Sequence, residues 1–93
     1  MSVEQLREWR LAGHPHMLVD VREPAEYAAS SIDGAVLVPL GELPRRLERF
    51  PRDRPVVVHC RTGLRSGRAA GILRAHGIDA RSLRGGIESW LRS

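Results

Sequence analysis

The stretch VVVHCRTGLRSGRA, residues 56–69, decides the fold of this chain. Residues 56–59 form a short apolar run of the kind that buried strands of parallel sheets contain. Residues 66–76 predict a helix, whose packing side would carry Ala69, Ala70, Ile72 and Leu73. Gly77 stands where a C-terminal helix cap belongs. Residues 60–65 therefore form a tight turn between a strand and a helix.

The same alternation of strands and helices extends outward along the chain. Strands are expected at residues 17–21, 35–38 and 80–83, and helices at residues 24–29, 41–50 and 85–91. Pro24 favours the first of these helix starts, and Pro44 would sit in the first turn of the second. A further helix begins with a capping box, Ser2 and Gln5, and ends at residues 13–15. Its buried side would hold Leu6, Trp9 and Leu11.

This order of elements predicts an α/β fold of three layers, with a mainly parallel central sheet and helices on both faces. The 93 residues, 42% of them hydrophobic, fit one small domain that spans residues 1–93. In parallel sheets, ligands bind beyond the carboxyl ends of the strands. Cys60 follows the clearest strand, so it is expected where this architecture binds ligands.

Composition excludes several other kinds of protein. The single cysteine excludes an intrachain disulfide and a Cys-rich zinc site. The 15 basic residues are all arginines, scattered among 11 acidic residues without a basic block, which disfavours nucleic-acid binding. The chain starts without an apolar signal sequence, and its apolar runs are too short to span a bilayer. We therefore expect a cytoplasmic protein with a reduced thiol and no membrane partner.

The turn after the apolar strand has the composition of an anion-binding loop. Gly63 permits a positive φ, and successive N–H groups in such a turn can form an anion-binding nest. The positive end of the next helix adds to this field, so the pKa of Cys60 should be depressed. Arg61 and Arg65 would strengthen the field, and Arg65 offers a planar fork for oxyanion oxygens.

Each neighbouring polar residue also has a simpler structural interpretation. A lone cysteine is more often a small buried apolar residue than a catalyst. His59 precedes Cys60 in a strand, so the two side chains should point to opposite faces, and His59 should be structural. Arg22 is expected to pair locally with Glu23 or Glu26, whereas Asp20 could orient an arginine, form an ion pair or cap a loop. The two glycines before the final helix, residues 85–86, could lie close to the site.

Five sequence blocks, in this order, resemble the single-domain rhodaneses and cover essentially the whole chain. They are Asp20-Val21-Arg22-Glu23 with Glu26-Tyr27, Ile32-Asp33-Gly34-Ala35, Cys60-Arg61-Thr62-Gly63-Leu64-Arg65-Ser66, Gly85-Gly86 and Trp90. One departure is Ser31, which stands where the family often has a histidine that is regarded as structural.

The resemblance implies a thiosulfate sulfurtransferase that works through a persulfide on Cys60. The catalytic residue would be Cys60, and the substrate-binding loop would be Arg61, Thr62, Gly63, Leu64, Arg65 and Ser66. Thiosulfate would be the sulfur donor, and Arg61 suits its anionic sulfonate end. Cyanide or a thiol would be the acceptor, for example thioredoxin, glutathione or a sulfur-carrier protein. No metal or organic cofactor is implied.

Two alternatives from other classes remain open. Phosphatases and arsenate reductases of similar fold have five residues between the cysteine and the arginine of this loop, whereas only residues 61–64 separate Cys60 from Arg65. The shorter loop would make a smaller cradle, which suits one sulfur atom better than a tetrahedral phosphate. A non-catalytic interaction domain is the other alternative, although such relatives commonly lose the loop cysteine.

Overall fold

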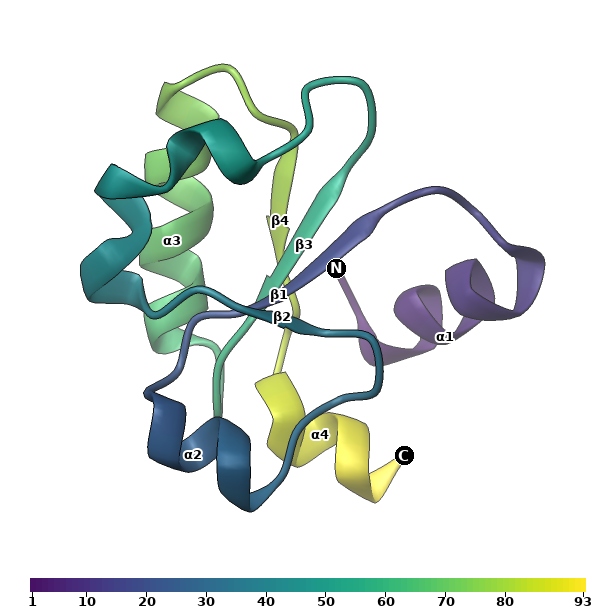
Figure 1. Ribbon diagram of the computed structural model, residues 1–93. Coiled ribbons are helices and arrows are strands. Elements are labelled where there is room, and N and C mark those ends of the chain that lie inside the picture. Colours follow the sequence, from purple (N-terminus) through teal and green to yellow (C-terminus); the bar gives the residue numbers. More distant parts are fainter.

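The computed structural model, which describes residues 1–93, contains four strands: β1 (Met17–Asp20), β2 (Val36–Leu37), β3 (Val56–His59) and β4 (Ala80–Ser82). They form one sheet in the order β2-β1-β3-β4, and each neighbouring pair is parallel (Figure 1). The α-helices are α1 (Val3–Ala12), α2 (Pro24–Ala29), α3 (Leu64–Ala75) and α4 (Gly86–Arg92). The α/β fold with a parallel sheet is therefore confirmed.

The central strands are buried on both faces, as their apolar composition predicts. All four residues of β3 are buried, and Val57 and Val58 are fully covered. Strand β1 lies beside β3 in a register that places Asp20 opposite His59. Both residues end their strands, so two polar groups meet at the carboxyl edge of the sheet.

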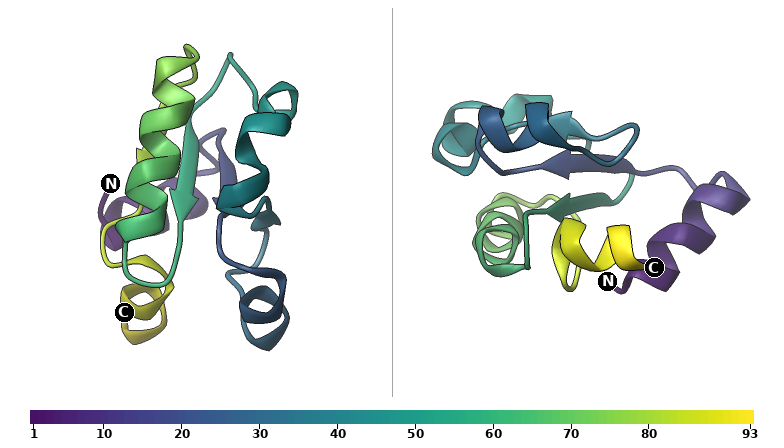
Figure 2. Two further views of the ribbon diagram at one scale, coloured as in Figure 1. Left: turned by 90° about the vertical axis from the view of Figure 1, so that its left-hand side faces the viewer. Right: turned by 90° about the horizontal axis from the view of Figure 1, so that it is seen from below.

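Helices cover the sheet on both faces, and each face has its own core. Alternate strand residues such as Val19 and Val58 pack with α3, together with Leu43 and Phe50. Leu18 and Val57 point the other way, into a smaller cluster that contains residues of α1 and α4. Figures 1 and 2 show α3 and α1 on opposite sides of the sheet, with α2 and α4 near the carboxyl ends of the strands.

The segment expected to be one helix over residues 41–50 instead forms two short 3-10 helices, η1 (Leu40–Arg45) and η2 (Leu47–Arg49). Pro44 lies inside η1, where it has no N–H to donate and where it disfavours the α conformation of the preceding residue. The helical spacing nevertheless identifies core residues, because Leu43 and Phe50 are buried. Leu47 packs partly against the same cluster.

The first helix has the expected ends but a narrower buried side. Ser2 and Gln5 exchange the hydrogen bonds of a capping box, and Gly13 ends the helix with a φ of 68°. Leu6 is fully buried, whereas Leu11 is 83% exposed, so the expectation for Leu11 is wrong. Leu11 stands one residue before the end of the helix, where no neighbouring element covers it.

The helices are short. The longest, α3, has 12 residues, and none combines the length and hydropathy that crossing a bilayer requires.

Candidate active site

Cys60 lies directly after β3, at the carboxyl edge of the sheet. The chain then turns sharply, and Gly63 is the N-cap of α3 with a φ of 124°. Residues other than glycine rarely adopt this conformation. Helix α3 begins at Leu64, two residues earlier than the sequence predicts. Cys60 is only 1% exposed and packs in the α3-side core. The thiol is thus held inside the loop rather than displayed on its surface.

Three hydrogen-bonding groups of the loop surround the Cys60 sulfur. The Gly63 N–H donates to Sγ at 3.1 Å, and the Ser66 N–H donates at 3.4 Å. The Ser66 hydroxyl oxygen lies 3.5 Å from Sγ. Burial raises the pKa of the Cys60 thiol, but hydrogen bonds from Ser66, Gly63 and Thr62 lower it, and the net direction is downward. The loop therefore favours a thiolate.

Both arginines of the loop are paired with carboxylates. Arg61 donates through Nε to Glu88 of α4 at 2.7 Å, and this pair is largely exposed. Arg65 donates through both terminal nitrogens to the carboxylate of Glu26, at 2.7 and 3.0 Å. The Arg65 fork, which the sequence suggests for oxyanions, is therefore occupied by a carboxylate of α2.

The Glu26–Arg65 pair fastens the loop to α2. The side-chain hydrogen bond from Arg65 is the main reason why the pKa of Glu26 falls to about 2. Glu26 also accepts the Glu23 N–H at 3.1 Å, so the same carboxylate organises the start of α2. In this structure Arg65 therefore positions the loop.

The remaining loop residues, Thr62 and Leu64, form its outer rim. Thr62 is exposed, and the side chain of Leu64 is among the most exposed apolar groups of the molecule, at 76%. Their side chains make no hydrogen bond to the sulfur, so only the backbone of Thr62 contributes to the field at Cys60.

The two glycines at the start of α4, its N-cap Gly85 and its first residue Gly86, lie against the loop. The N–H groups of Ile87 and Glu88 donate to the carbonyl oxygens of Cys60 and Arg61, at 2.9 and 3.2 Å. A Cβ on Gly86 would lie 2.5 Å from both of these oxygens. The loop backbone can approach α4 this closely only because residue 86 lacks a side chain.

His59 points away from the thiol, as strand alternation predicts. Its Nδ1 lies 3.2 Å from the Cys60 carbonyl oxygen, and its Nε2 lies 3.7 Å from Asp20 without a hydrogen bond. Burial lowers the pKa of His59, outweighing the nearby Asp20 carboxylate. The ring is therefore a neutral, packed group with no contact to the sulfur.

Arg22 pairs with Asp20, not with Glu23 or Glu26, which corrects the expected pairing. Both side chains are buried and share several hydrogen bonds, the shortest at 2.7 Å. Arg22 also donates to the Ser30 carbonyl oxygen at 2.7 Å. A buried charge is tolerated only with a close partner, and Asp20, which is itself fully buried, is that partner for Arg22.

The sequence does not predict three side chains that contact the loop: Glu26, Glu88 and Ser82. The Ser82 hydroxyl lies 2.7 Å from the Ser66 hydroxyl. Ser82 ends β4, and the carboxyl ends of parallel strands share one edge, so its position in the last predicted strand was the available signal. Glu26 stands in one of the blocks of the family resemblance, although not with Arg65 as its partner, and no signal marks Glu88.

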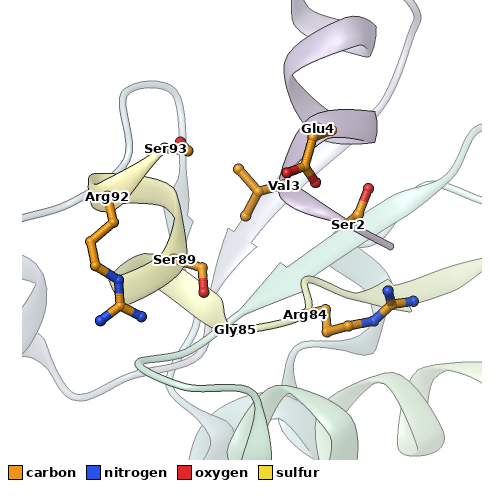
Figure 3. Close-up of a pocket in the computed structure, with 8 residues that line it drawn as sticks. All are labelled: Ser2, Val3, Glu4, Arg84, Gly85, Ser89, Arg92 and Ser93. Carbon is orange, nitrogen blue, oxygen red and sulfur yellow. The ribbon is translucent and has the colours of Figure 1, made fainter.

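A cavity elsewhere in the molecule does not include this site. It lies between the start of α1 and α4, where Glu4 and Ser2 face Ser89 and Arg92 (Figure 3). Cys60 lines neither this cavity nor the second one, which is near His14 and His16. No group of three or more His, Cys, Asp or Glu side chains is arranged to hold a metal ion.

The fold and the loop define a class of protein. It has a parallel α/β domain in which one cysteine directly follows a strand and accepts hydrogen bonds from N–H groups of the following turn. The family profile described as "Rhodanese-like domain" matches residues 2–93. The chain belongs to the rhodanese family.

Named relatives support sulfur transfer as the general activity. The chain is 43% identical over 77 residues to a protein of Allochromatium vinosum named "Sulfurtransferase", covering 82% of this chain and 72% of that protein. It is 40% identical over 95 residues to the probable adenylyltransferase/sulfurtransferase MoeZ of Mycobacterium tuberculosis. That match covers 99% of this chain but only 24% of the length of MoeZ.

Solved structures have the same fold. A rhodanese-like domain protein from Staphylococcus aureus superposes with a TM-score of 0.92 and 32% identity, covering 97% of this chain and 88% of that chain.

Proposed function

We propose that this protein is a thiosulfate sulfurtransferase and that Cys60 carries the sulfur. The Cys60 thiolate attacks the outer sulfur of thiosulfate, a new S–S bond forms, and the bond to the sulfonate sulfur breaks with release of sulfite. Cyanide or a thiolate then attacks the terminal sulfur of the persulfide. The Cys60 thiolate leaves and is ready for another cycle.

One observation carries the proposal: the only thiol of the chain is the point on which the loop donors converge. The N–H groups of Gly63 and Ser66 already donate to Sγ. A thiolate and a persulfide anion are both acceptors, so fixed donors of this kind stabilise the charge at each stage. No other side chain of the chain can form a persulfide.

Arg61 is the cation that would bind the sulfonate end of the donor. Its pair with Glu88 uses only Nε, and its terminal nitrogens make no hydrogen bond. Exposed ion pairs of this type contribute only about 0–1 kcal/mol, so a sulfonate can compete for Arg61. Because Cys60 is 1% exposed, the loop must open before thiosulfate reaches Sγ.

Cyanide or a thiol would collect the sulfur. Thioredoxin, glutathione and a sulfur-carrier protein are the thiol or protein acceptors we propose. Similarity to a relative named as an adenylyltransferase/sulfurtransferase supports a sulfur-carrier partner. A thiolate in this role needs a reducing compartment, which agrees with a cytoplasmic location.

Intact-protein mass spectrometry after incubation with thiosulfate, without reductant, tests the proposal. We expect one added sulfur, about 32 Da, on Cys60, and its loss when cyanide is added. Cys60→Ser should keep the circular dichroism spectrum of the folded protein and should gain no mass.

Two assays of the wild-type protein separate sulfur transfer from phosphate chemistry. Thiocyanate formation from thiosulfate and cyanide is expected, and hydrolysis of an aryl phosphate is not. Efficient phosphate hydrolysis with no reaction of thiosulfate would replace the proposal with the phosphatase alternative. Absence of both activities and of the added mass would favour the interaction domain.

A further inference from the structure

Ser82 stands behind the loop, one hydrogen bond away from the side chain that contacts the thiol. It is the last residue of β4 and is half-buried. Its Oγ lies 2.7 Å from Ser66 Oγ, which lies 3.5 Å from the Cys60 sulfur. Cys60, Ser66 and Ser82 therefore form a row of three hydrogen-bonding groups that runs from the loop after β3, through α3, to β4.

The Ser66 hydroxyl has one proton to donate and three neighbours, each of which can accept that proton or, where it carries one of its own, donate to the Ser66 oxygen. They are the Gly63 carbonyl oxygen at 3.2 Å, Ser82 Oγ at 2.7 Å and the Cys60 sulfur at 3.5 Å. A neutral thiol can donate to Ser66, which then donates to Gly63. A thiolate can only accept, so Ser66 must turn its proton to the sulfur.

Ser82 can either compete for that proton as an acceptor or act as a donor to Ser66. If Ser66 donated to Ser82, nothing would remain for the thiolate. The Ser82 hydroxyl has no other hydrogen-bond partner in the structure, so it can donate to Ser66. A hydroxyl that accepts a hydrogen bond also becomes a stronger donor in its own bond.

We propose that Ser82 is a positioning residue for the reactive sulfur: by donating to Ser66 it ceases to compete for the Ser66 proton and so favours donation of that proton to the Cys60 thiolate. The proposal rests on the proposed function only in treating this sulfur as the reacting atom. A purely structural alternative is that the bond merely ties α3 to β4. That alternative predicts a change in stability and no change in thiol ionisation.

The other charged and titratable groups around Cys60 stay in place when Ser82 is changed. They are Arg61 and Arg65 of the loop, Glu88 of α4, Glu26 of α2, His59 of β3, and Asp20 with Arg22 at the end of β1. Ser82→Ala alters none of these charges, so a changed titration would report the lost hydroxyl.

Thiolate absorbance in the ultraviolet, followed against pH, tests the proposal without a sulfur donor. Cys60 is the only cysteine, so subtraction of the Cys60→Ser titration isolates its signal. In Ser82→Ala we expect a higher midpoint, with about threefold less thiolate at any pH below it. Ser82→Thr keeps the hydroxyl and should titrate like the wild type. Ser89→Ala, which removes another half-buried hydroxyl that is not hydrogen-bonded to Ser66 or Cys60, is the matched control.

A second background tests whether Ser82 acts through Ser66. In Ser66→Ala, the additional change Ser82→Ala should leave the midpoint where it is. An equal shift in both backgrounds, or no shift in folded Ser82→Ala, would overturn the proposal. Because the titration measures ionisation alone, its failure leaves sulfur transfer by Cys60 standing, and failure of sulfur transfer leaves the titration interpretable.

Discussion

At the scale of the residue, each of the two arginines of the loop is already paired with a carboxylate. Glu26 occupies the Arg65 fork through two contacts, whereas Glu88 holds Arg61 through one exposed contact. The two arginines therefore differ in what they can do. Arg65 is fixed, whereas Arg61 keeps free terminal nitrogens, which under the proposed function would bind the anionic donor.

Glu88→Gln should strengthen binding of thiosulfate. The change removes the carboxylate that competes for Arg61, so we expect KM for thiosulfate to fall about threefold with little change in kcat. Steady-state kinetics at low salt measure the effect, which added salt should diminish. Glu48→Gln makes the same change in net charge on the exposed η2 segment and is the control. Equal effects of the two variants would show general electrostatics rather than release of Arg61.

At the scale of the element, the start of α4 and the loop after β3 are built as one unit. Two N–H groups of α4 donate to loop carbonyl oxygens, and Gly86 makes the approach possible. The site thus depends on a helix that contributes no side chain to the sulfur. Its contribution is to hold the loop carbonyls, so that the N–H groups of the same loop face Sγ.

Gly86→Ala should displace the loop and reduce sulfur transfer. The new Cβ would meet backbone atoms at 2.5 Å, and the residue has a φ of 57°, which disfavours alanine. We expect at least a tenfold fall in kcat/KM, roughly 1.4 kcal/mol, with a lower melting temperature.

Gly71→Ala provides the control for this change. Gly71 lies in the middle of α3, and a Cβ there would meet nothing within 4 Å. Alanine should stabilise the helix by up to about 1 kcal/mol and leave activity unchanged. Wild-type activity in folded Gly86→Ala would refute the dependence of the loop on α4.

At the scale of the whole molecule, one ion pair connects elements that are far apart in the chain. Glu26 of α2 and Arg65 of the loop are 39 residues apart. Together they join α2 to the start of α3. Since the folded state depresses the pKa of Glu26 to about 2, this pair links global stability to pH.

The sign of that dependence follows from which state binds the proton first. The unfolded chain protonates Glu26 near pH 4.5, before the folded chain does so near 2. The stabilisation is therefore complete above pH 4.5 and is lost as the pH falls towards 2. In urea titrations, the wild type should lose about 1 kcal/mol more than Glu26→Gln over this range, because the pair is about one-third exposed.

Glu42→Gln is the control for the acid titration. It breaks a weaker pair, in which Arg46 makes a single contact of 3.4 Å with Glu42. The free energy of unfolding of Glu42→Gln should fall between pH 4.5 and 2 as steeply as that of the wild type. If the free energy of unfolding of Glu26→Gln fell as steeply with acid as that of the wild type, the link between Glu26 ionisation and stability would be refuted.

The sequence by itself determined the order of the elements, the parallel sheet and the place of Cys60. These follow from local patterns: the apolar run of β3, the capping box of α1 and the positive φ at Gly63. Five ordered blocks also sufficed to indicate the family. The prediction of one α-helix over residues 41–50 was wrong. It rested on the spacing of apolar residues, which is that of an α-helix, whereas Pro44 favours a 3-10 helix.

Only the tertiary structure decided which groups surround the loop. Arg65 meets Glu26, Arg61 meets Glu88 across 27 residues, and Ser66 meets Ser82 across 16. The sequence contains 11 acidic residues that could in principle pair with an arginine. Only the positions of α2 and α4 at one edge of the sheet select Glu26 and Glu88 as the partners. The physical reason is that charge pairing and hydrogen bonding act over a few ångströms in space, whatever the separation along the chain.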